Sequence, residues 1–245
     1  MILVTLMMAL AGTAHAQTAD EVVAKARAAN QVESSIQAIR MTIINDKGRE
    51  RVRELESRSR RDDDTVRSFL EFQSPSDVAG MRLLMIDHPD KSDELLVFLP
   101  AYSQVNRISG NNRKSSFVGS DFTYEDMEIR QAADGAHTLV EQTDAVWVID
   151  TVPTDSIQYA KIRTHISKSD LLARKVEFFD LQGQPFKVLE VSKTAQSGAL
   201  TIPTESVMKN LKKGSQTRLE ITSHDLNIDL SKLPADTFTP AYLER

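Results

Sequence analysis

Short segments in which apolar and polar residues alternate dominate the sequence, and this period of two is typical of half-buried β-strands. Turn signals such as Asp46-Lys47-Gly48 and Lys213-Gly214 separate several of these segments. Roughly a dozen strands are predicted, at residues 36–43, 49–58, 65–72, 81–86, 94–99, 147–152, 159–166, 174–179, 186–191, 201–208 and 218–221. No βαβ rhythm interrupts them, so we expect one antiparallel sheet that is strongly curved or wrapped into a barrel.

Helical patterning is confined to a few places. Residues 18–31 are predicted to form an amphipathic helix, with Thr18 or Asp20 as its N-cap and with Val22 and Val23 on its apolar face. A single turn is predicted at 124–127, and a short helix at 240–244. The predicted fold is therefore mainly β with few helices.

The first 16 residues form an apolar run that ends in Ala14-His15-Ala16, the small-x-small pattern of a signal peptidase site. The run is shorter than the about 20 apolar residues that a membrane-spanning helix needs. We predict a signal peptide cleaved after Ala16, the alternative being a buried N-terminal helix. No linker or repeat divides residues 17–245, which we predict to form one domain. Export of a cysteine-free chain points to a bacterial periplasm.

Composition argues against several classes of function. The chain has 30 Lys and Arg against 35 Asp and Glu, a net charge of −5, whereas a nucleic-acid-binding domain is normally basic. It has no cysteine, which removes thiol catalysis, Cys-ligated metals and a lipid anchor on an N-terminal cysteine. The five histidines are scattered, and no phosphate-binding or nucleophile-elbow motif occurs. We expect no enzyme, no cofactor and no metal site; a periplasmic hydrolase stays a third possibility, although no residue stands out for its catalysis.

Residues 95–127 begin as a strand and continue as a long polar loop. Its candidate rim or partner residues are Arg107, Arg113, Lys114, Phe117, Gly119, Ser120, Asp121, Phe122 and Tyr124. Gly119 permits a tight turn, Ser120 or Asp121 can cap the turn that follows, and the aromatic side chains are predicted to pack inward. The basic side chains either meet an anionic headgroup or an acidic partner, or are simply solvated. Both an ordered segment that seals one rim of the sheet and a functional loop fit this pattern.

The stretch LPAYSQVNRISGNNRKSSFVGSDFTYEDM, residues 99–127, resembles the signature of the LolA-like outer-membrane lipoprotein-sorting proteins, in the branch often found beside RND or MMPL-type exporters. Weaker similarity lies upstream, in residues 72–80, and downstream, at Trp147, Pro153 and residues 233–243. The resemblance implies an unclosed LolA/LolB-like barrel of about eleven antiparallel strands around an N-terminal helix. It also implies a hydrophobic concave face that takes acyl chains.

The apolar phase of the strands supplies candidate ligand-binding residues for such a face. They are Met41, Ile43, Leu70, Phe72, Leu83, Met85, Val97, Leu99, Trp147, Ile149, Phe178, Leu189 and Val191. Each is either a ligand contact or part of a core packed against the helix. A shift of one residue in a strand would turn these side chains to the other face, and the pattern leaves that choice open. Burying a methylene contributes about 0.8 kcal/mol, so an enclosed chain of about 16 carbons gains on the order of 12 kcal/mol.

The predicted function is a periplasmic carrier or chaperone that shields the acyl chains of a lipid or lipoprotein and passes them toward the outer membrane. The alternative is an accessory or sensor subunit that docks on an RND-type exporter or a membrane regulator without ferrying cargo. The expected partners are acyl chains and an inner-membrane RND or MMPL-type exporter, with no nucleic acid. The free protein is expected to be a monomer.

Overall fold

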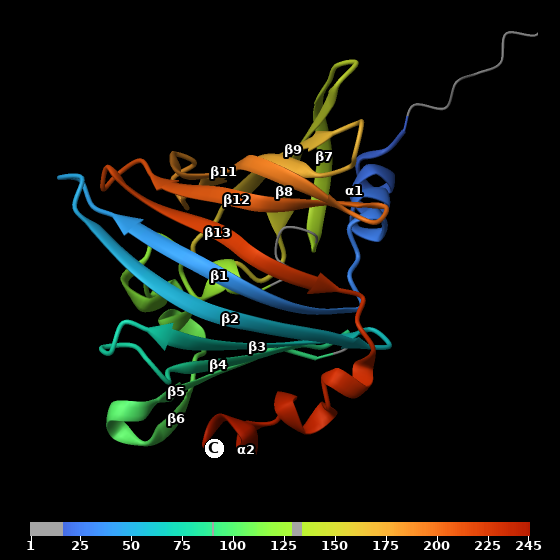
Figure 1. Cartoon of the computed structure of the whole chain (residues 1–245). Coiled ribbons are helices and arrows are strands. Elements are labelled where there is room, and N and C mark those ends of the chain that lie inside the picture. Colours follow the sequence, from blue (N-terminus) through green and yellow to red (C-terminus); the bar gives the residue numbers. More distant parts are fainter. Residues whose placement is uncertain (1–16, 90, 129–133) are drawn as a thin grey trace, which may run out of the picture.

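The computed structural model of the chain describes residues 17–89, 91–128 and 134–245 (Figure 1). The predicted signal peptide, residues 1–16, lies outside the described residues. No helix in the described ranges is long and apolar enough to cross a membrane.

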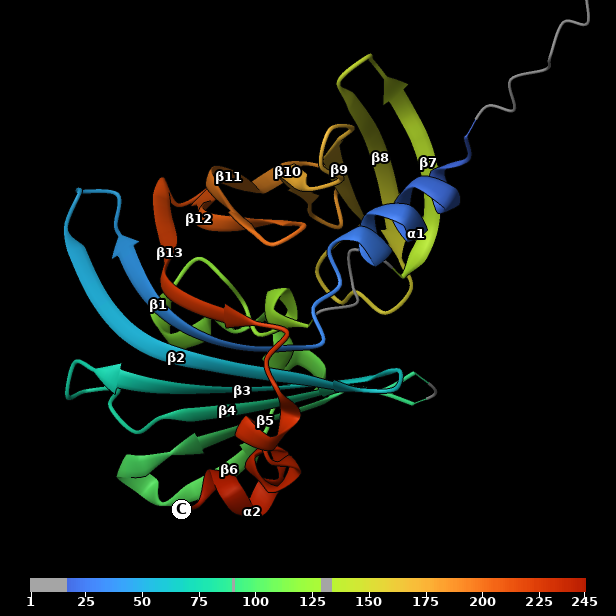
Figure 2. The same ribbon diagram turned by 45° about the vertical axis from the view of Figure 1, so that its right-hand side comes forward.

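Thirteen strands form one antiparallel sheet, in the order β6-β5-β4-β3-β2-β1-β13-β12-β11-β10-β9-β8-β7. The strands are β1 (Ser34–Ile44), β2 (Glu50–Asp62), β3 (Thr65–Ser74), β4 (Arg82–Asp87), β5 (Glu94–Leu99), β6 (Gln104–Arg107), β7 (Gly135–Gln142), β8 (Val146–Pro153), β9 (Lys161–Ser167), β10 (Ala173–Phe179), β11 (Pro185–Ser197), β12 (Leu200–Asn210) and β13 (Ser215–Leu226). Two meanders, β1–β6 and β7–β13, are therefore joined by the pairing of β1 with β13. Since β6 and β7 are the two edges of the sheet, the curved sheet is not closed (Figure 2).

The mainly β, unclosed antiparallel sheet and the N-terminal helix agree with the predicted fold class. The prediction missed β6 and β7, because no residue on these edge strands is buried and their apolar pattern is weak. The 3-10 helix η4 (Glu125–Met127) and helix α2 (Pro240–Leu243) lie where a turn and a short helix were predicted.

Helix α1 (Ala19–Ala29) begins with a capping box. The Thr18 backbone N–H donates to Glu21 Oε2 at 2.9 Å, and the Glu21 N–H donates to Thr18 Oγ1 at 3.2 Å. These bonds satisfy two of the donors that the first helical turn leaves free. Val22 lies on the face of α1 that points away from solvent and is fully buried. It packs in an apolar cluster with Trp147 and Ile149 of β8 and so attaches the helix to the sheet.

The C-terminal segment covers one face of β3–β5, the face opposite to the long central loop (Figures 1 and 2). Phe69 and Leu84 point to this side and form a buried cluster with Leu233, Phe238 and Leu243. Alternate residues of β3 and β4 therefore serve two separate cores, which explains why β4 is buried along both faces.

Replacing Leu84 with alanine tests the contribution of this second core. Leu84 is 0 % exposed, so we expect the free energy of unfolding to fall by about 3 kcal/mol through lost burial and a residual cavity. Urea denaturation measures the change. Val140→Ala, on edge strand β7 where the side chain is exposed, is the control; equal losses in the two variants would contradict the assignment.

Candidate functional site

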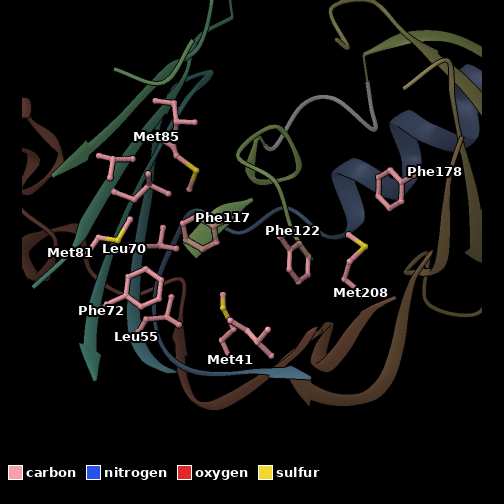
Figure 3. Close-up of a cluster of buried hydrophobic side chains, with 14 of the residues drawn as sticks. Met41, Leu55, Leu70, Phe72, Met81, Met85, Phe117, Phe122, Phe178 and Met208 are labelled. Atoms are coloured by element: carbon pink, nitrogen blue, oxygen red, sulfur yellow. The ribbon is translucent and has the colours of Figure 1, made fainter. Parts of the chain in front are cut away.

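The concave side of the sheet carries a large apolar cluster (Figure 3). Eight of the predicted ligand-binding residues lie buried in it: Met41, Ile43, Leu70, Phe72, Leu83, Met85, Val97 and Phe178. Leu99 and Leu189 are partly buried against the same cluster, whereas Val191 is half-buried and lies outside it. The alternation therefore placed most of these side chains on a common face, although their role as ligand contacts stays a prediction.

Trp147 and Ile149 belong to a different part of the concave face. They pack under α1 together with Val22 and Ile166, and the strand register places Trp147 directly opposite Ile166 on β9. Lys168 Nζ lies 4.9 Å from the Trp147 ring centroid. The helix thus covers the β7–β9 end of the face (Figure 2), while the larger cluster occupies its middle.

The chain between β6 and β7 crosses the concave face, and we call its described part, residues 108–128, the plug. Phe117 is 0 % exposed and its ring centroid lies 5.7 Å from that of Phe72 on β3. Phe122 is buried in the same cluster, on the side of Met208 of β12 (Figure 3). The two phenylalanines therefore bridge the two halves of the sheet, and Tyr124 packs on Phe117 at 5.7 Å.

A tight turn directs the two phenylalanines to opposite halves of the sheet. Val118 and Gly119 have φ values of +51° and +74°, a conformation that is strained for a β-branched residue and free for glycine. The Ser120 Oγ donates to the Phe117 carbonyl at 2.6 Å and closes the turn. Strain of this kind persists only where surrounding contacts compensate for it, so the turn depends on the packing of the plug.

Buried polar contacts attach the plug to the far half of the sheet. Asp121 accepts hydrogen bonds from Ser215 Oγ at 2.5 Å and Thr217 Oγ1 at 2.8 Å on β13. The fully buried Glu125 accepts from Ser156 Oγ at 2.6 Å and from the Ile157 N–H at 3.1 Å. Each carboxylate thus receives donors from a segment distant in sequence, which specifies where the plug lies.

An ion pair between Asp126 of the plug and Lys187 of β11 lies in the interior. Lys187 Nζ is 2.5 Å from Asp126 Oδ2, and both side chains are 2 % exposed. Tyr159 also donates its hydroxyl to Asp126, and the rings of Tyr159, Phe178 and Phe186 lie 5.1, 5.5 and 5.6 Å from the ammonium group. Burial lowers the pKa of Lys187 despite the attraction of Asp126, and burial together with the charge of Asp126 raises the pKa of Tyr159.

The three predicted basic rim residues do not form one patch. Arg107 is exposed at the end of β6. Arg113 donates to Glu128 Oε1 at 2.7 Å and to the Asp155 carbonyl at 3.2 Å, so it ties the plug to the segment after β8. Arg107 and Arg113 line one pocket, whereas Lys114 lines a separate one, beside the β12–β13 turn.

Comparisons with known proteins place this geometry in a family. A family model described as "Uncharacterized protein" matches residues 64–245. A solved outer-membrane lipoprotein-sorting protein domain from Vibrio parahaemolyticus is 26% identical, with a TM-score of 0.84 over 93% of this chain and 98% of that one. The chain belongs to the LolA-like family. No protein with a curated description matches the sequence of this LolA-like chain.

Two further structures share the LolA-like fold. A DUF1329 family protein from Desulfovibrio piger is 21% identical, with a TM-score of 0.85 over 92% of this chain and 97% of that one. A LolA superfamily protein from Nitrosomonas europaea is 22% identical, with a TM-score of 0.73 over 93% of this chain and 100% of that one.

Sequence reasoning named Ser120 and Asp121 but missed Glu125, Asp126 and Lys187, the other buried polar residues of this LolA-like site. Lys187 lies two residues before Leu189 on β11 and therefore faces the same way as that predicted apolar position. A lysine at an apolar position of a strand is a signal that could have revealed Lys187, because a buried lysine needs a buried acidic partner. The identity of that partner, Asp126, depends on the path of the plug.

For the Asp126–Lys187 pair, we expect a single substitution to destabilise the protein much more than the double substitution does. Asp126→Asn leaves a buried ammonium without its carboxylate and is expected to lower the free energy of unfolding by about 3 to 5 kcal/mol. Adding Lys187→Met removes that charge and should restore most of the loss in chemical denaturation. Glu54→Gln, which breaks the exposed Arg40–Glu54 pair, is the control and should have little effect. A harmless Asp126→Asn would show that the pair does not hold the plug.

Proposed function

We propose that this LolA-like chain is a periplasmic carrier that shields the acyl chains of a lipid or lipoprotein on its concave face and passes them toward the outer membrane. The observation that carries the proposal is that the apolar middle of the face is filled by Phe117 and Phe122 of the chain's own plug. On this proposal the plug keeps the face dry when no ligand is bound and is displaced when an acyl chain binds. The action is binding and release, without a covalent step.

The energies are compatible with exchange of the plug for an acyl chain. Returning two phenylalanines to water costs about 1.5 to 3 kcal/mol each, whereas burying a chain of about 16 carbons gains on the order of 12 kcal/mol. The difference is available to break the polar contacts of Asp121, Glu125 and Asp126. Met41, Met85 and Met208 line the same cluster, and methionine adapts to chains of different shape.

Native mass spectrometry and lipid extraction of the protein purified from the periplasm test the proposal directly. We expect a co-purifying amphiphile or, for the ligand-free protein, uptake of a fluorescent fatty-acid probe. Absence of both would refute a carrier function.

Competition between plug and ligand makes a sharper prediction. Phe122→Ala weakens the plugged state, so the binding-competent fraction should rise and the apparent affinity for the fatty-acid probe should increase by about tenfold. Fluorescence titration measures it. Leu84→Ala is the matched control, because it destabilises the other core and leaves the plug untouched. If both variants bind the probe as the wild type does, the plug does not compete with the ligand.

The second candidate is an accessory or sensor subunit that docks on an inner-membrane RND or MMPL-type exporter. The polar attachment of the plug favours it, since the buried contacts of Asp121, Glu125 and Asp126 hold the concave face filled. Stable stoichiometric capture of a membrane partner by a protein that takes up no probe would support this function over the carrier.

A further inference from the structure

A cavity lies at the rim of the plug, against the turn between β12 and β13. Its volume is about 270 Å³. The plug contributes Lys114, Asp121 and Phe122 to its wall, and strands β11 and β12 contribute Lys187 and Asn210.

Positive charge gathers around this rim cavity in a chain whose net charge is −5. Its charged lining comprises Lys114, Lys187, Lys212, Lys213 and a single carboxylate, Asp121. Lys187 pairs with Asp126, and Lys212 pairs with Asp180 at 2.6 Å. Lys114 and Lys213 are exposed and form no ion pair within the described ranges. An anion in the cavity could therefore bind the ammonium groups of Lys114 and Lys213 without breaking an existing ion pair.

The cavity also holds an oriented amide donor. Asn210 is 8% exposed, and its Oδ1 accepts the Lys213 backbone N–H at 3.0 Å. The Asn210 Nδ2 group makes no hydrogen bond with another described residue, so it can donate to the oxygen of a ligand in the cavity.

The inner wall of the cavity is apolar and borders the candidate acyl site. Phe122 lines the cavity and is also a buried member of the large apolar cluster. Phe186, on the other side, packs against that cluster and lies 5.2 Å from Lys212 Nζ. A ligand with its anionic head in the cavity would place its apolar tail at Phe122, the side chain that the acyl chain is proposed to displace.

We propose that the rim cavity binds the phosphate of an amphiphile headgroup whose acyl chain lies on the concave face. The inference rests on the proposed carrier function and adds the class of its cargo. A phosphate offers several oxygen acceptors and up to two negative charges, which suits two unpaired ammonium groups and an amide better than a fatty-acid carboxylate does.

The test compares three probes by calorimetric titration: a single-chain acylglycerol phosphate, the neutral monoacylglycerol of the same chain length, and glycerol phosphate. The acylglycerol phosphate is expected to bind about tenfold more tightly than the neutral lipid at low salt, with the advantage shrinking as ionic strength rises. Lys114→Gln/Lys213→Gln should remove that advantage and leave affinity for the neutral lipid unchanged. Lys47→Gln/Lys232→Gln, an equal charge change at exposed lysines outside the cavity, should retain it.

The outcomes separate the two proposals. Equal affinity for both lipids, or equal loss in both double variants, overturns the headgroup site and leaves the carrier function standing. Binding of glycerol phosphate that depends on Lys114 and Lys213, with no lipid bound, supports the phosphate site and refutes the carrier function. Binding of none of the three probes overturns both.

Discussion

The pairing of β1 with β13 is the interaction on which the rest of the structure depends. It runs from Ser35 opposite Leu226 to Ile44 opposite Gln216 and joins the two ends of the chain in the middle of the sheet. Without it, each meander would present its apolar face to water, since neither half covers itself. With it, the two halves curve toward each other and create one concave face (Figure 2).

A concave face of this width needs something to fill it, and the chain supplies the plug. Phe117 serves one half of the sheet and Phe122 the other, while Asp121, Glu125 and Asp126 accept hydrogen bonds from the far half. The two phenylalanines supply buried apolar surface, and the buried carboxylates specify where the plug lies. An apolar filling with specific polar contacts is stable yet exchangeable, because an acyl chain offers the same burial without the polar contacts.

Much of the fold could be read from local pattern. The capping box at Thr18 and the alternation on β1 and β3 depend only on neighbouring residues, so they were visible in the sequence. The edge strands β6 and β7 were not visible, because neither has a buried residue and their sequences therefore lack a clear apolar pattern. Trp147 had the right phase on β8, yet which partner it meets, α1 rather than the plug, depends on contacts across about a hundred residues or more.

The sequence by itself determined that this chain forms a curved antiparallel sheet with an apolar face, because a period of two records which side of each strand is buried. It also determined that the long loop carries aromatic and basic residues. Only the tertiary structure decided that this loop fills the concave face, that Lys187 meets Asp126, and that Lys114 joins Lys212 and Lys213 at one cavity. Those contacts join residues far apart in the chain, and local periodicity contains no information about which distant segments meet.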